Sequence, residues 1–158
     1  MFVDTITNKV LLYPTNGYHL LKQQFSALIN VINLFSQDRS FFVSEIETTA
    51  FTKNKNPESY LGEHFEISLD TTYYEYEKIN ICLENALYSP VGEWGVMISH
   101  ESHAVLGGSK DFVNSFKQFY PDWKNDQKKF LENFGYWSKI VKTDLSWIQP
   151  FIDYVNKK

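Results

Sequence analysis

The spacing of apolar side chains changes twice along this 158-residue chain, and each change separates one kind of secondary structure from another. From Gly17 to Ser36 the apolar residues recur at steps of three and four, which predicts an amphipathic helix. After Asp38 apolar and polar residues alternate, as in strands with one buried face. After Gly108 the helical spacing returns. This order predicts an α+β fold.

The alternating region contains about five short runs, which we expect to form a mainly antiparallel sheet because their connections are short. The runs are Phe41–Thr49, His64–Asp70, Tyr73–Leu83, Glu93–Ser99 and His103–Gly107. Only three residues separate the last two runs, which favours a tight hairpin.

Three further helices are predicted after the strands. Ser109 stands where the N-cap of the first is expected, and Pro121 suits the first position of the second. The apolar stripe of the second helix ends before Gly135, and Pro150 predicts a kink or a late start in the third. We expect one globular domain over residues 1–158, with an N-terminal helix and three C-terminal helices packed on one face of the sheet.

The single cysteine, Cys82, excludes an intramolecular disulfide and a multi-cysteine zinc site, and it favours a reducing compartment. The segment Met1–Asn16 lacks the basic start and apolar run of a signal peptide. The longest apolar stretch, Phe25–Phe35, is much shorter than the roughly 20 residues that cross a bilayer. The sequence therefore predicts a cytoplasmic protein with no membrane partner.

Acidic residues are concentrated in the predicted sheet. The net charge is −4, but residues 44–101 hold eleven acidic and three basic residues, whereas residues 102–158 hold six acidic and nine basic ones. Alternation places Glu66 and Asp70 opposite the apolar side chains of their strand. If Glu75, Glu77 and Glu84 share that side, the face attracts a basic partner.

These five acidic residues, Glu66, Asp70, Glu75, Glu77 and Glu84, are the candidate partner-binding residues. An alternative interpretation is that the sheet is charged only to stay solvated and to avoid pairing with another sheet. Both interpretations argue against a nucleic-acid partner, because phosphate contacts require a basic patch.

The groups that could carry chemistry do not form a known catalytic pattern. His100, Glu101 and His103 lack the helix and the two-residue spacing between Glu and the second His that zinc proteases use. Cys82 has no basic neighbour to activate it. The sequence therefore predicts a protein without enzymatic activity, metal or cofactor. Two alternatives stay open: a small-ligand-binding or enzymatic domain that uses the region His100–Ser109, and an adaptor that docks through aromatic residues of the last helix.

One stretch supports a more specific hypothesis. Gly92–Ser99, with its Trp-Gly pair, is followed by His103–Ser109, by a predicted helix over Lys110–Phe119, and by Trp147 near the C-terminus. This arrangement resembles small bacterial immunity proteins of polymorphic-toxin and contact-dependent inhibition systems. The resemblance implies an antidote that binds one cognate toxin domain and blocks it inside the producing cell. It also implies a basic toxin as the partner, because the toxins of such systems are frequently basic nucleases.

Overall fold

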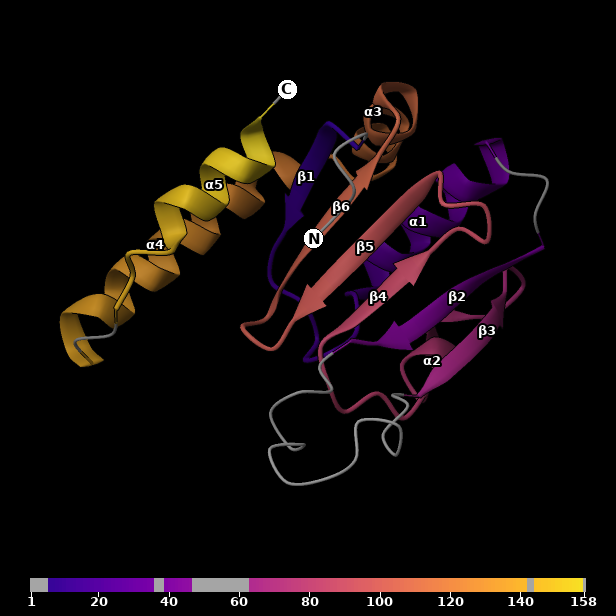
Figure 1. Cartoon of the computed structure of the whole chain (residues 1–158), viewed down its shortest axis with the longest axis horizontal. Coiled ribbons are helices and arrows are strands. Elements are labelled where there is room, and N and C mark those ends of the chain that lie inside the picture. Colours follow the sequence, from indigo (N-terminus) through magenta and orange to yellow (C-terminus); the bar gives the residue numbers. More distant parts are fainter. Residues whose placement is uncertain (1–5, 36–38, 47–62, 142–143, 158) are drawn as a thin grey trace, which may run out of the picture.

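The computed structural model describes residues 6–35, 39–46, 63–141 and 144–157, which form an α+β fold with a six-stranded antiparallel sheet and five helices (Figure 1). The strands are β1 (Asn8–Leu12), β2 (Ser40–Glu45), β3 (His64–Ser68), β4 (Asn85–Tyr88), β5 (Trp94–Ser99) and β6 (His103–Gly108). Their order in the sheet is β1-β6-β5-β4-β2-β3. The helices are α1 (Lys22–Phe35), α2 (Tyr73–Tyr76), α3 (Lys110–Phe119), α4 (Trp123–Val141) and α5 (Ile148–Asn156).

The helices lie on both faces of the sheet, so the prediction that they pack on one face is wrong. Leu12 and Leu106 belong to the larger core, which α1, α2 and α3 cover. Their neighbours Leu11 and Val105 point to the opposite face, where α4 and α5 form a second core. Because successive strand side chains alternate between faces, strands β1 and β6 are buried on both sides.

The first element is a strand rather than the expected helix. β1 pairs with β6 at the edge of the sheet, and the N-terminal helix follows it. That helix begins at Lys22, later than the apolar spacing predicts. Asn16 and His19 bind each other through two backbone hydrogen bonds of 2.8 and 3.0 Å, with Gly17 in the left-handed region at φ 57°. This tight turn occupies the residues that the sequence assigns to the start of the helix.

The predicted strand Tyr73–Leu83 is instead the short helix α2 followed by a turn. Thr72 and Glu75 form a capping box, in which the Thr72 backbone N–H donates to the Glu75 carboxylate at 2.8 Å. Tyr76, the last residue of α2, is buried, and its ring stacks on the Phe25 ring with centroids 4.3 Å apart. The strand that pairs with β2 and β5 in place of the predicted one is β4, which the sequence pattern missed.

The hairpin of β5 and β6 and the three C-terminal helices are present as predicted. Pro150 is the third residue of α5, which confirms the late start. Helix α4 begins two residues after Pro121 and continues through Gly135, so both predicted limits of that helix are wrong.

Ser109 caps α3: its side-chain oxygen accepts a hydrogen bond from the Phe112 backbone N–H at 3.2 Å. We expect Ser109→Ala to lower the free energy of unfolding by about 1 kcal/mol, because that N–H then loses its partner inside the protein. Urea unfolding followed by circular dichroism measures the change. Ser109→Asp retains an acceptor at the cap and should unfold near the wild-type midpoint; equal losses in both variants would contradict the role of the cap.

Candidate functional site

One part of the sheet is covered by no helix of the described residues. The strands concerned are β4, β2 and β3, on the face to which α4 and α5 pack further along the sheet (Figure 1). We call this surface the open sheet face. The strand register places on it the side chains of Ser40, Phe42, Ser44, His64, Glu66, Ser68, Ala86 and Tyr88, which are half-buried or exposed.

Aromatic rings on the open sheet face are held by their neighbours. The Phe42 ring stacks on His64 with centroids 5.0 Å apart and contacts the Tyr88 ring at 5.8 Å. The Ser44 hydroxyl lies 2.6 Å from His64 Nδ1 and 3.0 Å from the Tyr88 hydroxyl. Hydrogen bonds and stacking therefore fix the orientation of three rings before any partner arrives.

The structure does not bring the five acidic candidates to one face. Glu66 lies on the open sheet face as predicted, where the Ser40 hydroxyl donates to it at 2.6 Å. Asp70 is exposed in the turn after β3. Glu75 and Glu77 belong to α2 and its C-cap, because the predicted strand there is a helix, and α2 packs on the other side of the sheet.

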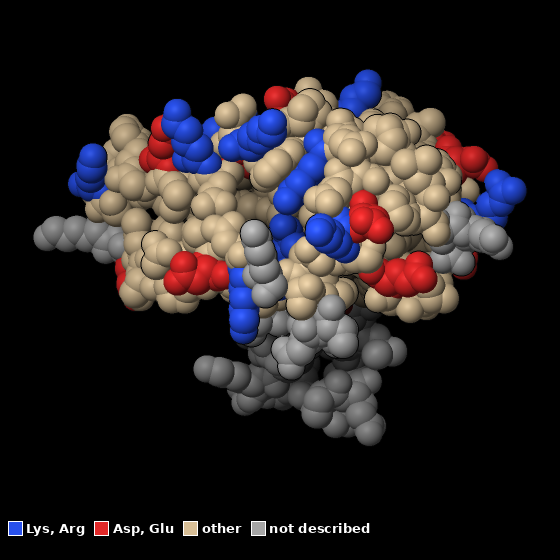
Figure 2. All heavy atoms as spheres, turned by 90° about the horizontal axis from the view of Figure 1, so that it is seen from above, with Lys and Arg blue, Asp and Glu red and all other residues tan. Residues whose placement is uncertain are grey.

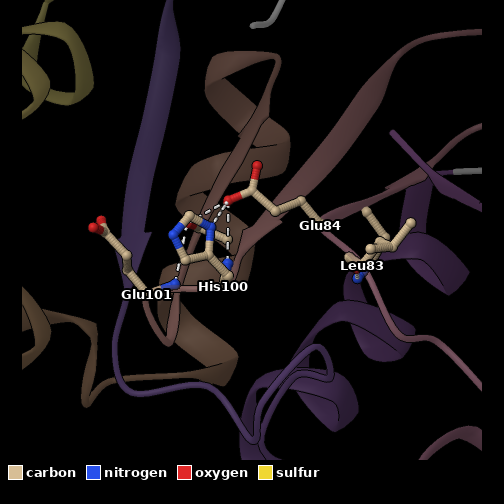
Figure 3. Close-up of polar contacts among 6 residues, drawn as sticks. Leu83, Glu84, His100 and Glu101 are labelled. Carbon is tan, nitrogen blue, oxygen red and sulfur yellow. Dashed lines mark hydrogen bonds and ion pairs between the residues drawn. The ribbon is translucent and has the colours of Figure 1, made fainter. Parts of the chain in front are cut away.

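Glu84, the fifth acidic candidate, lies just before β4 and joins the loop of the β5–β6 hairpin (Figure 3). Its Oε1 atom accepts from the Ser99 hydroxyl at 2.8 Å, from the His100 backbone N–H at 3.2 Å and from His100 Nδ1 at 2.6 Å. Burial alone raises the pKa of the Glu84 carboxyl, but these hydrogen bonds and the nearby His100 outweigh burial and lower it overall. Oε2 is turned away from His100 and has no hydrogen-bond partner within the described ranges (Figure 3).

A groove of about 420 Å³ lies next to Glu84, between the sheet and α5. We call it the α5 groove. Its lining residues are Glu84, Met97, Ile98, Ser99, His103, Val105, Pro150, Phe151 and Tyr154. Five of these residues are apolar, and the polar ones are Glu84, Ser99, His103 and Tyr154. The size and the lining are those of a small-molecule site.

His103 is the buried titratable group of this groove, with 6% of its surface exposed. Burial lowers the pKa of its imidazole to about 4, although the Glu101 carbonyl and the Glu84 carboxylate favour the charged form. The ring is therefore neutral at neutral pH. Its Nδ1 atom and the Tyr154 hydroxyl are both buried, and neither has a hydrogen-bond partner in the described part of the chain.

The two histidines of the hairpin do not meet in one site. His100 is paired with Glu84 at the surface, whereas the His103 ring packs against Phe130 and Phe151. Ser102 between them adopts φ 58°, which reverses the chain. Within the described ranges no group of three or more His, Cys, Asp or Glu side chains is arranged to hold a metal ion. Cys82 is exposed in the loop before β4, not on a strand as predicted.

Comparison of the chain with protein-family models, curated proteins and solved structures found no match. The function is therefore argued from the geometry of the molecule. Among the described helices, none combines the length and apolar character that crossing a bilayer requires.

Basic side chains gather near the middle of the view in Figure 2. Strand β1, which carries Lys9, is the edge of the sheet opposite β3. Lys9, Lys110, Lys117 and Lys157 line a hollow of about 580 Å³ there. Burial lowers the pKa of Lys9, and the neighbouring Lys157 lowers it further. The sequence indicated this group of lysines only through an excess of basic residues after residue 101. These four lysines form a local basic patch at the edge of the sheet opposite β3.

Helix α4 exposes aromatic residues, whereas the aromatic residues of the last helix are half-buried. Trp147 and Phe151 of the last helix region are half-buried against the second core. Tyr136, Trp137 and Ile140, in the part of α4 that the sequence pattern did not extend to, are 60%, 48% and 56% exposed. The aromatic residues of the last helix, through which an adaptor would dock, are therefore largely packed against the protein.

Proposed function

We propose that this protein is an immunity-type inhibitor that binds a basic toxin domain through its open sheet face and neutralises it by covering its working surface. The observation that supports this most directly is the combination of oriented aromatic rings on that face with the carboxylate of Glu66 beside them and that of Glu84 just before β4. Aromatic side chains supply contact area at the centre of protein interfaces, and carboxylates select a basic partner. A stoichiometric inhibitor of this kind needs no catalytic group of its own.

The geometry suggests how such a complex is held. Phe42 and Tyr88 provide the central contacts, and their orientation costs little entropy on binding because neighbouring groups already fix it. Glu66 and Glu84 stand on either side of these rings along the sheet. The lysines at the β1 edge repel a basic partner, so the approaching toxin is steered to the acidic strands.

The experiment that tests the proposal starts from the partner itself. The tagged chain is used to isolate its partner from the strain that produces it, and the partner is then expressed alone and together with the chain. We expect the partner alone to arrest growth and coexpression of the chain to restore it. A partner that is harmless by itself would contradict the immunity function, even if it binds tightly.

Single substitutions on the open sheet face distinguish the effect of charge on the association rate from the effect of direct contacts on the dissociation rate. We expect Glu66→Lys to slow association at low salt, and added salt to remove the difference, because the side chain acts through long-range charge. We expect Phe42→Ala to leave association nearly unchanged and to speed dissociation by about tenfold or more, because it removes a central contact. Surface plasmon resonance at several salt concentrations measures both rates.

Glu93→Lys is the matched control for the charge. Glu93 is an exposed carboxylate before β5 that lines a hollow with Phe35 and Phe112, away from the open sheet face. Glu75 is unsuitable because its carboxylate completes the cap of α2. If Glu93→Lys slows association as much as Glu66→Lys does, only the net charge matters and the open sheet face is not the contact surface.

A further inference from the structure

We propose that the α5 groove binds a small organic cation, a protonated amine carried on an apolar body. This inference requires no partner protein. It shares Glu84 with the proposed function, but the other groove side chains lie outside the aromatic cluster of the open sheet face. It rests on three features of the groove. One oxygen of the Glu84 carboxylate has no hydrogen-bond partner among the described residues, the apolar wall is large enough for a small organic molecule, and two polar atoms of the wall are buried without described partners.

The carboxylate at one end fixes the charge of the ligand. Glu84 Oε1 is fully used by Ser99 and His100, and these contacts hold the carboxylate in place (Figure 3). Oε2 has no partner in the part of the chain that the structure describes, and Glu84 lines the groove. An ammonium group donating to Oε2 would form a charge-assisted hydrogen bond in a partly buried place, where such bonds are strongest.

The remaining walls accept the apolar body. Met97 and Val105 form the floor on β5 and β6, and Pro150 and Phe151 face them from α5. One place beside the Tyr154 ring is already taken by Lys9, whose ammonium lies 4.5 Å from the ring centroid. A second cation is therefore unfavourable at that end. We therefore expect the ammonium group of the ligand to lie beside Glu84 and the apolar body of the ligand to extend toward α5.

Two buried atoms in the wall add a second argument for a ligand. His103 Nδ1 and the Tyr154 hydroxyl have no hydrogen-bond partner among the residues that the structure describes, and 94% of the His103 surface is buried. Buried polar atoms without partners cost free energy, and native structures leave few of them. Polar hydrogens of a bound ligand would satisfy such atoms. The neutral His103 ring places no positive charge against a cation. Burial and the nearby Glu84 carboxylate raise the pKa of the Glu101 carboxyl.

The test uses three probes that share one ring system and differ in the charge of the end group: tryptamine, tryptophol and indole-3-propionate. Isothermal titration calorimetry at neutral pH measures each affinity on the full chain. We expect tryptamine to bind at least about tenfold more tightly than tryptophol, and indole-3-propionate to bind most weakly. Equal affinities for the amine and the alcohol, or no binding of any probe, would overturn the proposal.

Glu84→Gln removes the charge while keeping an oxygen that can accept from Ser99 and His100. We expect this variant to lose the preference for tryptamine over tryptophol. Glu93→Gln is the matched control, since it removes the same charge from an exposed position outside the groove and outside the open sheet face, and it should bind tryptamine as the wild type does. Equal losses in the two variants would mean that the amine responds only to the overall charge.

A measurement on the wild type keeps the test valid if Glu84→Gln fails to fold. The chain has two methionines, and Met97 lines the groove. With methyl-labelled methionine, tryptamine should shift the Met97 methyl resonance at the concentrations that calorimetry gives for binding. Binding that leaves this resonance unchanged takes place elsewhere and contradicts the assignment of the α5 groove. A lysine-containing peptide tested in the same way distinguishes a free amine from a side chain of a partner, and we expect it to leave the resonance unshifted.

Discussion

Replacing Trp94 by alanine is expected to lower the free energy of unfolding by about 3–5 kcal/mol, a large part of the stability of an ordinary domain. Trp94 is 3% exposed, and its ring stacks on Phe112 with centroids 5.7 Å apart and planes 7° from parallel. It also contacts the Phe41 ring at 6.2 Å. The substitution therefore opens a cavity between β5 and α3, where the sheet and the first group of helices meet.

Trp137→Ala is the matched control for this prediction, because Trp137 is 48% exposed on α4 and its removal leaves no enclosed cavity. We expect a change of less than about 1 kcal/mol for it. Thermal and urea unfolding followed by circular dichroism measure both variants. A Trp94→Ala protein that unfolds with the wild-type midpoint would place the ring at a contact surface rather than in the core.

The elements that the sequence predicted well are those whose signals are local. Trp94, Val96 and Ile98 occupy alternate positions of one strand, and all three point into the larger core. The hairpin that follows has a three-residue turn between two such runs, and Ser109 occupies a cap position directly before an apolar helical stripe. In each case the residues that decide the conformation are neighbours in the chain.

The elements that the sequence missed depend on partners far along the chain. β1 is a strand because Lys9 and Val10 pair with Gly107 and Leu106, and no local pattern reveals that pairing. The helix α2 had a local signal in the Thr72–Glu75 capping box, but the β-forming residues that follow hid it. Local propensity was a weak guide there because burial of Tyr76 in the core decides the outcome.

The residues of the candidate site also divide into those that a local pattern places correctly and those that depend on distant parts of the chain. Alternation within one strand correctly placed Glu66 on the outer face, but it could not show that Glu75 lies on a helix across the sheet. The contact of Glu84 with Ser99 requires the register of β4 against β5, which places residues 84 and 99 opposite each other. The α5 groove requires in addition the position of the last helix over β5 and β6. The alternation within a single strand reveals neither the register of β4 against β5 nor the position of α5 over the sheet.

The unfolding free energy should fall steeply as the pH is lowered from neutral toward 4, and His103 should account for about 3 kcal/mol of that loss. Burial lowers the pKa of His103 from its ordinary 6.5 to about 4. Below pH 6.5 the unfolded chain takes up a proton at this ring, whereas the folded chain does not until the pH approaches 4. Stability that is fully present above pH 6.5 is therefore lost progressively down to pH 4, at about 1.4 kcal/mol per pH unit.

His103→Phe isolates this contribution, because it keeps a ring among Phe130, Trp147 and Phe151 and removes the titration. Other groups, such as Asp126, whose pKa burial raises, titrate in both proteins and cancel in the difference. We expect the wild type to lose about 3 kcal/mol more than the variant between neutral pH and pH 4. Phe151→Leu alters the same packing without a titrating group, so it should destabilise equally at both pH values. If the wild type and His103→Phe lose stability in parallel, the folded protein accepts the proton on His103 at little cost, and the ring is not held neutral by the second core.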